Sequence, residues 1–373
     1  MKVLYVTSNG GIHDYRFLKK MVDDYKVLLL HYASRELMDD IKELKNLRII
    51  SKKPIIKSFP LFSELLHFRK IYKKFRPDIV HTGYVWQVGI LASVFNTHHH
   101  LSMPWGSDIL FQPEKNFIIR KIVRKVMKQC DHIHCDAEYV KQKIREEYKI
   151  DEAKFSVFPR GVDLKQFTPL AKADCKNQLG IDTEKFVIHF NRHLEPVYGI
   201  DTLLEGYKIF ASKKDDILLL MVSSGSLKNK TVKFIKDNKL DSKVKIIGKI
   251  PNTKIPFYLG ASDIYISTSK SDGSSLSMLE AMAMGLGLIV TDVPAIKEWV
   301  TEENGIMVRR NNSLEVSSAL EKYYNDRQLI KTHGDVNILI AREKANWDKN
   351  YLKLKDIYAE LMGKNSFNHS PDK

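Results

Sequence analysis

The sequence is poor in cysteine, with 3 among 373 residues, and it contains no long apolar segment. Three cysteines make no even framework of disulfide bonds, so they exclude a disulfide scaffold and indicate a reducing compartment. The longest apolar runs, at residues 27–30 and 217–222, fall far short of the roughly 18–20 residues that cross a bilayer. Asn9-Gly10-Gly11 interrupts the start of the chain before the apolar region of a secretory signal could form. We therefore expect a cytoplasmic protein.

Acidic residues are fewer than basic ones: 45 Asp and Glu stand against 60 Lys and Arg, a net charge of +15. The excess lies mainly in residues 1–150, which hold 27 basic and 16 acidic residues, against 33 and 29 in residues 151–373. The first half is therefore expected to meet an anionic partner. Composition alone does not choose among nucleic acid, anionic lipid and a phosphorylated acceptor.

The length, with 43% hydrophobic and 28% charged residues, fits a globular protein of two domains. Short apolar strands alternate with amphipathic helices along the first half, which predicts a parallel sheet with helices on both faces. The expected strands cover residues 2–7, 26–30, 79–81, 101–103 and 132–134, and the expected helices cover residues 14–24, 62–75 and 116–129.

The second half repeats this alternation. Strands are expected at residues 186–190, 217–223, 244–247, 263–267 and 288–291, and helices at residues 199–212 and 276–284. We predict a first domain at residues 1–168, a polar linker at 169–184, a second domain at 185–345, and a C-terminal helix with a polar tail at 346–373. Two doubly wound domains are expected to face each other across a cleft at the carboxyl ends of their strands, where such sheets bind ligands.

A loop and a helix of the second domain carry the strongest chemical signal. The loop Asp272-Gly273-Ser274-Ser275 follows an expected strand, and a helix begins near Ser275. Free backbone N–H groups and the positive end of the helix dipole suit a phosphate or diphosphate there. Glu280, more than one turn into the helix, suits the vicinal hydroxyls of a ribose, and Asp272 suits those of a transferred sugar. Taken singly, each carboxylate would read as a helix cap or a surface residue.

Asp272 and Glu280, eight residues apart and followed by Ala-Met-Ala-Met-Gly, resemble the E-x7-E segment of the retaining glycosyltransferases of the group 1 type (family 4). Other segments resemble the family in the same order: Phe158-Pro159-Arg160-Gly161-Val162-Asp163 with Phe167, Asn191-Arg192 through Tyr198-Gly199-Ile200-Asp201, and Pro294 to Glu298 with Gly305. The resemblance covers nearly the whole second domain and scattered points of the first. It implies the GT-B fold, an α/β architecture of two doubly wound, Rossmann-like domains facing across a cleft.

The resemblance also implies roles for individual residues. Glu280 would hold the ribose of a nucleotide-sugar, Arg192 would neutralise the departing diphosphate, and Tyr198 would be among the donor-binding residues. The residues that would meet the sugar and diphosphate are Asp272, Gly273, Ser274, Ser275 and Leu276, and those near the base are Lys249, Ile250 and Pro251. Gly10 and Gly11 would let the backbone approach the donor or acceptor. The predicted catalytic residues are Asp272, Arg192, Asp108 and His81.

Three positions depart from the family pattern. Asp272 is shorter than the usual Glu, and Tyr198 replaces a diphosphate-binding Lys, which leaves Arg192 as the main cation. Trp105 replaces a His near the reacting sugar. We interpret these as subgroup features and expect Trp105, Gly106 and Ser107 near the acceptor or sugar. His81 and Asp108 are expected to bind hydroxyl groups there.

No metal or cofactor is expected, because the family uses cationic side chains and backbone donors, and no Asp-x-Asp metal site is present. The run Cys130-Asp131-His132-Ile133-His134-Cys135 looks like a zinc cluster, but alternate strand residues point to opposite faces and the ligands would not converge. The helices at 62–75 and 116–129 carry apolar residues at core spacing and cations on the outer face. That face is either simply solvated or rests on anionic lipid, each cation contributing about 1 kcal/mol.

The sequence thus predicts a hexosyltransferase-type enzyme of cell-envelope polysaccharide synthesis. It would transfer a sugar, with retention, from a nucleoside-diphosphate sugar to a glycan or lipid-linked glycan, in the cytoplasm or on the inner face of the membrane. A sugar-nucleotide epimerase or phosphorylase on the same fold is the alternative enzyme. A basic nucleic-acid-binding protein is the alternative of another class, although the aromatic residues among the cations have core spacing and form no stacking platform. A nicotinamide oxidoreductase is disfavoured, since no Gly-x-Gly-x-x-Gly follows the first strand.

Overall fold

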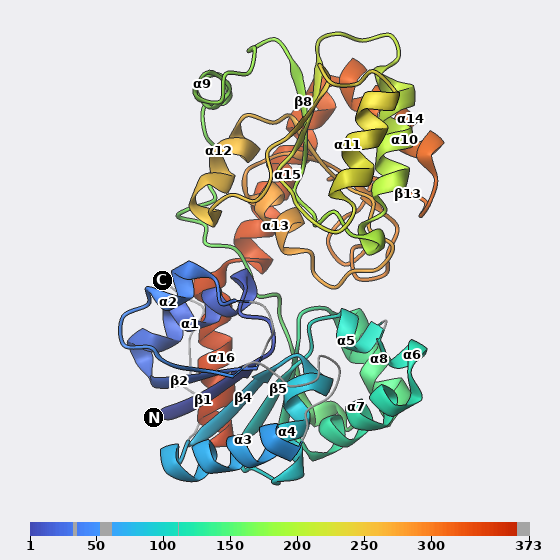
Figure 1. Cartoon of the computed structure of the whole chain (residues 1–373). Helices are drawn as coiled ribbons and strands as arrows, with labels where there is room; N and C mark the ends of the chain where they lie inside the picture. Colours follow the sequence, from blue (N-terminus) through green and yellow to red (C-terminus); the bar gives the residue numbers. More distant parts are fainter. Residues whose placement is uncertain (33–35, 53–61, 111, 364–373) are drawn as a thin grey trace. The chain divides into compact units, whose positions relative to one another are not determined.

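The computed structural model describes residues 1–32, 36–52, 62–110 and 112–363, and the chain divides into two compact units (Figure 1). The first unit comprises Met1–Arg160 with Asp348–Lys373, and the second comprises Gly161–Trp347. The first unit thus ends before the expected boundary at residue 168. The expected linker at 169–184 belongs to the second unit, where part of it forms helix α9 (Lys172–Gln178).

The C-terminal helix α16 (Trp347–Leu361) belongs almost entirely to the first unit, although the chain enters it from the second. Its apolar face explains this return, because Leu354 and Tyr358 are fully buried. Tyr351 Oη also donates a hydrogen bond to Asp24 Oδ2 at 2.8 Å. The helical spacing of this segment is visible in the sequence, but its packing partner is not.

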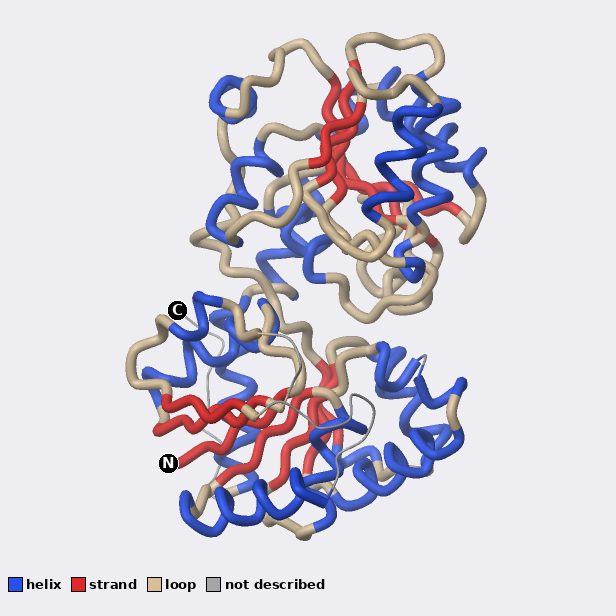
Figure 2. Tube along the Cα trace, in the orientation of Figure 1, coloured by secondary structure: helices blue, strands red, loops and turns tan. Residues whose placement is uncertain are grey.

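The first unit is a seven-stranded parallel sheet in the order β3-β2-β1-β4-β5-β6-β7, with helices on the outside (Figures 1 and 2). Its strands are β1 (Lys2–Thr7), β2 (Lys26–His31), β3 (Arg48–Ser51), β4 (Ile79–Gly83), β5 (His100–Met103), β6 (His132–Cys135) and β7 (Phe155–Val157). Its remaining helices and short helical turns are α1 (Ile12–Asp24), α2 (Asp39–Lys42), α3 (Phe62–Phe75), η1 (Val85–Gly89), α4 (Ile90–Val94), α5 (Ser107–Leu110), α6 (Gln112–Lys115), α7 (Phe117–Gln129), α8 (Glu138–Tyr148) and η2 (Glu152–Lys154).

The second unit is a six-stranded parallel sheet in the order β10-β9-β8-β11-β12-β13. Its strands are β8 (Phe186–Phe190), β9 (Ile217–Met221), β10 (Val244–Ile246), β11 (Ile264–Ser267), β12 (Gly287–Thr291) and β13 (Ile306–Val308). Its other helices and turns are η3 (Pro196–Tyr198), α10 (Ile200–Ala211), α11 (Lys228–Asp237), η4 (Asn252–Lys254), α12 (Ile255–Gly260), α13 (Leu276–Ala283), α14 (Ser313–Asn325) and α15 (Arg327–Lys344). Strand order reverses between β8 and β11, as it does between β1 and β4, and such switch points are where doubly wound sheets bind ligands.

All the predicted strands and helices are present, with small shifts at their ends. Strands β3, β7 and β13 were not predicted. Each has only three or four residues, lies at the edge of its sheet and is largely half-buried or exposed, so it lacks the continuous apolar run that marks a central strand. Within the described part of the chain, no helix combines the length and apolarity needed to cross a membrane.

Candidate active site

The switch point of the second sheet brings two predicted catalytic residues together. Arg192 follows β8, and Asp272 lies in the loop between β11 and α13. Since β8 and β11 are adjacent and parallel, the loops after them lie at the same edge of the sheet. The side chains of Arg192 and Asp272 form an ion pair there, with a distance of 2.7 Å between Nη2 and Oδ2.

The guanidinium of Arg192 is held from several sides. Besides its bond to Asp272, it donates through Nη1 to Ser275 Oγ at 2.7 Å and to Ser277 Oγ at 3.2 Å. The ring of Tyr198 lies against it, with 4.4 Å between the ring centroid and Cζ. These contacts fix the planar fork in one orientation. Tyr198, which stands where the resembled family has a lysine, therefore positions Arg192 through its ring.

The ion pair is largely withdrawn from solvent, the side chains of Arg192 and Asp272 being 11% and 14% exposed. Burial raises the pKa of the Asp272 carboxyl, while Arg192 opposes that rise. Burial disfavours the charge on Arg192, but the Asp272 carboxylate together with Tyr198 and Tyr265 keeps the pKa of the guanidinium above its ordinary value. The Nε of Arg192 is buried and finds no acceptor in the part of the chain that the structure describes. A permanent cation with an unused donor therefore lies at the switch point.

A close backbone approach fixes the spacing of the two loops. Thr268 Oγ1 donates to the carbonyl oxygens of Tyr198 and Gly199, both at 3.0 Å. Gly199 has a φ of +63°, and a Cβ there would lie only 2.1 Å from the carbonyl oxygen of Thr268. Only glycine satisfies both conditions. Gly199 thus allows the loop that follows β11 to lie against the turn before α10.

Helix α13 is buried along its whole length. Gly273, Ser274 and Ser275, which lead to its first residue Leu276, are buried as well. Ser274 Oγ accepts a hydrogen bond from Trp299 Nε1 at 3.0 Å. Glu280 is 4% exposed and lies one helical turn after Ser277, on the same face. This places Glu280 on the side of α13 that carries a partner of Arg192, while its contact with a ribose stays a prediction.

Lys249, Ile250 and Pro251 lie in the loop after β10. Strand β9 joins β10 to β8, so this loop occupies the same edge of the sheet as Arg192. Lys249 and Pro251 are exposed and Ile250 is half-buried. Their contact with a base stays a prediction.

Two residues of this site were missed in the sequence. Ser277 donates or accepts a hydrogen bond with the buried Tyr265 hydroxyl at 2.8 Å, and it also receives one from Arg192. Ser277 is the second residue of α13 and lies two positions after Ser275, so a serine repeated at the helix start was the available signal. Tyr265 lies in the middle of an apolar strand, where no pattern marks it out.

In the first unit, Gly10 and Gly11 form the turn between β1 and α1. The fully buried Asp14 organises this turn, accepting hydrogen bonds from Tyr5 Oη at 2.9 Å, Thr7 Oγ1 at 3.2 Å and the Gly10 N–H at 2.7 Å. Burial raises the pKa of Asp14 to about 6. Asp14 was missed, although an acidic residue in the first helical turn after Gly-Gly was a usable signal.

Trp105 is half-buried and lies beside an unexpected cation. The guanidinium of Arg160 lies 5.3 Å from the centroid of the Trp105 ring, and Arg160 Nη2 donates to Asp136 Oδ2 at 2.9 Å. On another side, a Cβ at Gly83 would lie 2.9 Å from Trp105 Nε1, so glycine is needed for the indole to fit. The Arg in Pro159-Arg160-Gly161 was noticed in the sequence but given no role; the structure makes it the support of Trp105.

Asp108 has a different role from the predicted one. It is fully buried, and its Oδ1 and Oδ2 accept hydrogen bonds from the backbone N–H groups of Trp105 and Val85 at 2.8 and 2.9 Å. Burial raises its pKa to about 6. Asp108 therefore ties the loop after β5 to the start of η1 and presents no free carboxylate to a sugar. Gly106 is buried in this loop with a φ of +89°, and Ser107 begins α5, its side chain lying outside the described residues.

The prediction that His81 touches a substrate does not fit its surroundings. Its ring is fully buried beside Tyr5 and Phe17, and its Nδ1 forms a hydrogen bond with the Tyr358 hydroxyl at 2.6 Å. Burial, and then the nearby His134 and His100, lower its pKa well below the ordinary value. His81 is a neutral core residue that α16 covers. The sequence predicted this helix but not where it packs, so it could not exclude a substrate contact of His81.

The Cys130–Cys135 segment behaves as an ordinary buried strand. His132 Nε2 hydrogen-bonds Ser156 Oγ and His134 Nε2 bonds the Phe158 carbonyl oxygen, both at 2.9 Å. No group of three or more His, Cys, Asp or Glu side chains in the described ranges is arranged to hold a metal ion.

Comparison with known families decides what the two units are. Residues 172–335 match the model described as glycosyl transferases group 1, and residues 15–166 match the model described as glycosyltransferase family 4. This chain is a glycosyltransferase of the group 1, family 4 type. The family predicted from Asp272, Glu280 and the accompanying motifs is confirmed, and its members transfer a sugar from a nucleotide sugar.

The glycosyltransferase has relatives along its whole length. It is 25% identical over 374 residues to an uncharacterised glycosyltransferase of Methanocaldococcus jannaschii, with 97% of each chain covered. It is 27% identical over 316 residues to the UDP-Gal:α-D-GlcNAc-diphosphoundecaprenol α-1,3-galactosyltransferase of Escherichia coli, covering 80% of this chain and 79% of that one. Sucrose-phosphate synthase of Thermosynechococcus elongatus superposes with a TM-score of 0.83 at 16% identity, covering 97% and 99% of the chains. The GT-B fold is thereby confirmed.

Proposed function

We propose that this glycosyltransferase moves a hexose from a nucleoside-diphosphate sugar to a glycan or lipid-linked glycan of a cell-envelope polysaccharide, keeping the anomeric configuration and using no metal ion. The observation that carries the proposal is the Arg192 guanidinium, held by Asp272 and Ser275 at the switch point of the second sheet. A buried, oriented cation suits a diphosphate whose negative charge increases as the sugar leaves. The name of the Escherichia coli relative, a UDP-Gal:α-D-GlcNAc-diphosphoundecaprenol α-1,3-galactosyltransferase, supports a donor and an acceptor of these classes.

The residues of the second unit would have different roles, some in binding the donor and some in stabilising the leaving group. Arg192 would stabilise the departing diphosphate without reorganising, because its orientation is set before the donor arrives. The backbone N–H groups at the start of α13 would add donors to the same phosphates, and Glu280 would hold the ribose. Asp272 would orient a hydroxyl of the transferred sugar. Its carboxylate is already engaged by Arg192, which supports a front-face displacement, with the leaving diphosphate taking the acceptor proton, over attack by Asp272 itself.

Product analysis tests this function. The purified protein is incubated with UDP-, GDP- or ADP-hexoses and with short glycan or lipid-linked acceptors, with and without EDTA. We expect a glycoside whose anomeric proton signal matches the configuration of the donor, at the same rate with EDTA. An inverted product or loss of activity with EDTA would contradict the mechanism. Interconversion of the nucleotide sugar without an acceptor would instead identify an epimerase, and transfer to inorganic phosphate a phosphorylase.

We also propose that the first unit rests on anionic lipid through α7. Phe117 and Ile118 at the start of this helix are 69% and 44% exposed, whereas most of its later apolar residues, such as Val123, are buried. Exposed cations follow on the same helix: Arg120, Lys121, Arg124, Lys125 and Lys128. Exposed apolar residues followed by cations suit a surface of acyl chains under anionic headgroups.

Flotation with vesicles tests this surface. The protein should rise with anionic vesicles at low salt, remain behind with neutral vesicles, and lose binding at high salt. Phe117→Ser should reduce recovery, whereas Leu314→Ser, at an apolar residue of the second unit that is 67% exposed, should not. Equal recovery of both variants would mean that α7 is simply solvated.

A further inference from the structure

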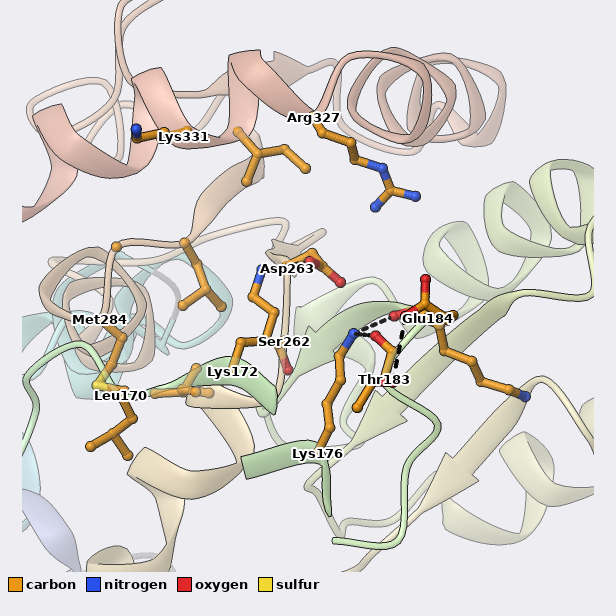
Figure 3. A pocket seen from close by; sticks show the side chains of 16 residues that line it. Leu170, Lys172, Lys176, Thr183, Glu184, Ser262, Asp263, Met284, Arg327 and Lys331 are labelled. Carbon is orange, nitrogen blue, oxygen red and sulfur yellow. Dashed lines mark hydrogen bonds and ion pairs between the residues drawn. The ribbon is translucent and has the colours of Figure 1, made fainter. Parts of the chain in front are cut away.

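A second concave site lies in the second unit, away from Arg192. It is a pocket of about 580 Å³, which we call the amino-end pocket (Figure 3). Its wall includes Lys185, Asp263 and Leu286, each of which directly precedes β8, β11 or β12. The pocket therefore lies at the amino ends of three parallel strands, the opposite edge of the sheet from the loops that follow β8 and β11.

The two sites are too far apart to share a ligand. Lys185 precedes β8 and Arg192 follows it, so a strand rise of about 3.3 Å per residue separates them by about 20 Å. The volume of the amino-end pocket is within the range of small-molecule sites. A molecule bound there would touch none of the residues assigned to the nucleotide sugar.

Cations dominate the amino-end pocket. Five line it, and only two carboxylates accompany them; these seven residues are Lys172, Lys176, Lys185, Arg327, Lys331, Glu184 and Asp263. Asp263 is already engaged, because its Oδ1 accepts from Lys172 Nζ at 2.6 Å and its Oδ2 accepts from the Val187 N–H at 2.7 Å. Lys185, Arg327 and Lys331 form no ion pair with a described carboxylate.

Two of the cations are held in place. Lys176 is 3% exposed, and its Nζ donates to the carbonyl oxygens of Thr183 and Lys185 at 2.7 and 2.6 Å. The guanidinium of Arg327 lies over the Phe186 ring, with 4.0 Å between Cζ and the ring centroid. In Figure 3, Arg327 extends from its helix toward the side of the pocket formed by Thr183 and Glu184. This orientation precedes any ligand and lowers the entropy lost on binding one.

The cations also repel one another. Burial lowers the pKa of Lys176, and the neighbouring Lys172 and Arg327 lower it further, although Asp263 and Glu184 oppose them. In a concave site such repulsion is relieved when an anion binds. Four further lining residues are apolar: Leu170, Leu259, Met284 and Ile330. In Figure 3, Leu170 and Met284 lie on the side of the pocket away from the Arg327 guanidinium. The pocket thus offers an anion-binding side and a side that can contact carbon.

We propose that the amino-end pocket binds a small phosphorylated molecule, with Arg327 on its phosphate, Lys331 adding to the positive charge of the pocket, and the apolar side chains against its organic part. This site is separate from the donor site and does not depend on the identity of the transferred sugar. Arg is well suited to such a ligand because its fork can donate two parallel hydrogen bonds to a phosphate.

Calorimetric titration of the full chain with phenyl phosphate, a phosphate monoester with an apolar body, tests the proposal. The pocket variant is Arg327→Gln with Lys331→Gln, both at exposed positions. The matched control is Lys322→Gln with Arg342→Gln, which removes two exposed cations from α14 and α15 outside the pocket. Thermal unfolding of each variant verifies that it is folded.

We expect the pocket variant to lose affinity for phenyl phosphate by about tenfold or more, and the control to bind as the native chain does. Glu184→Gln, which removes the exposed carboxylate, should strengthen binding. Three results would overturn the proposal: the same affinity in the native chain and the pocket variant, an equal loss in the control, or no binding by the native chain up to about 10 mM. Any binding of the probe at the donor site would be the same in all these proteins, so it cannot imitate the expected result.

Discussion

The ion pair between Arg192 and Asp272 predicts an unequal response to the loss of either partner. Asp272→Asn leaves a guanidinium that stays charged at every accessible pH, in a site where its side chain is only 11% exposed. Loss of one partner of a buried pair costs about 3–5 kcal/mol. We therefore expect this variant to be strongly destabilised, to a similar extent at neutral and at mildly acid pH.

Arg192→Gln should behave differently, because the remaining carboxyl can take up a proton. Burial already raises the pKa of Asp272, and Arg192 is the main group that opposes this rise. Without Arg192 the folded-state pKa of Asp272 moves further above its unfolded value. Each unit of difference between the two pKa values costs about 1.4 kcal/mol of stability at a pH above both of them. When the pKa of a carboxyl is higher in the folded than in the unfolded state, the protein loses stability as pH rises from the unfolded-state value to the folded-state value. The deficit should thus be largest at neutral pH and shrink as pH falls.

Urea unfolding read by hydrogen–deuterium exchange measures this deficit in the second unit alone. Peptides covering β11 and α13 (Ile264–Ser267 and Leu276–Ala283) report on the loop that carries Asp272. The comparison is made at about pH 7.5 and about pH 5.5, with the native chain at each pH as reference. The double variant Arg192→Gln with Asp272→Asn should be more stable than the sum of the single losses predicts. Equal deficits of both single variants at both pH values would refute the assignment of a buried, mutually dependent pair.

Three further predictions concern other residues. Glu280→Ala should weaken nucleotide-sugar binding by about 1.5–3 kcal/mol, because a charge-assisted contact is lost. Glu303→Ala, at an exposed position, should leave binding unchanged. If calorimetry gives the Glu280→Ala variant the affinity of the native chain, the ribose contact is excluded. Burial raises the pKa of Asp108 from its ordinary value of 3.8 to about 6, so the folded chain loses stability as pH rises between these values. Asp108→Asn should therefore flatten that part of the pH–stability curve. Gly199→Ala should lower both the melting temperature and kcat, because the new Cβ would lie 2.1 Å from the Thr268 carbonyl oxygen. Gly180 is the matched control, since it also has a positive φ but a Cβ there would meet nothing within 4 Å. Gly180→Ala should therefore lose only about 1 kcal/mol of stability, from backbone strain. Equal effects of the two glycine substitutions would show that the contact with Thr268 has no importance.

The predicted elements were accurate where the chain must be apolar. Strands such as β1 and β8 are central in their sheets and covered on both faces, so nearly every residue in them is apolar. The donor loop was equally visible, because Asp272, the adjacent glycine and serines, and Glu280 are close together in the chain. Arg192 was found through its neighbours Tyr198 and Gly199, although its bond to Asp272 joins residues 80 positions apart.

The predicted roles failed where burial decides them. His81 was placed among the catalytic residues because it ends an expected strand, and Asp108 because it belongs to the family-like segment around Trp105. Both are fully buried and engaged by other groups. His81 is covered by Tyr358, from a helix at the far end of the sequence. No local sequence pattern predicts the contact between His81 and Tyr358, because it depends on how the apolar face of α16 packs.

The sequence by itself determined that there are two doubly wound sheets, which family the chain belongs to, and which loop carries the donor motif, because strand alternation and short motifs are local properties of the chain. Only the tertiary structure decided that Tyr198 supports Arg192, that Arg160 supports Trp105, and that five cations gather at the amino ends of β8, β11 and β12. These arrangements join residues from separate segments, and their energy comes from burial and proximity, which exist only once the sheets have formed.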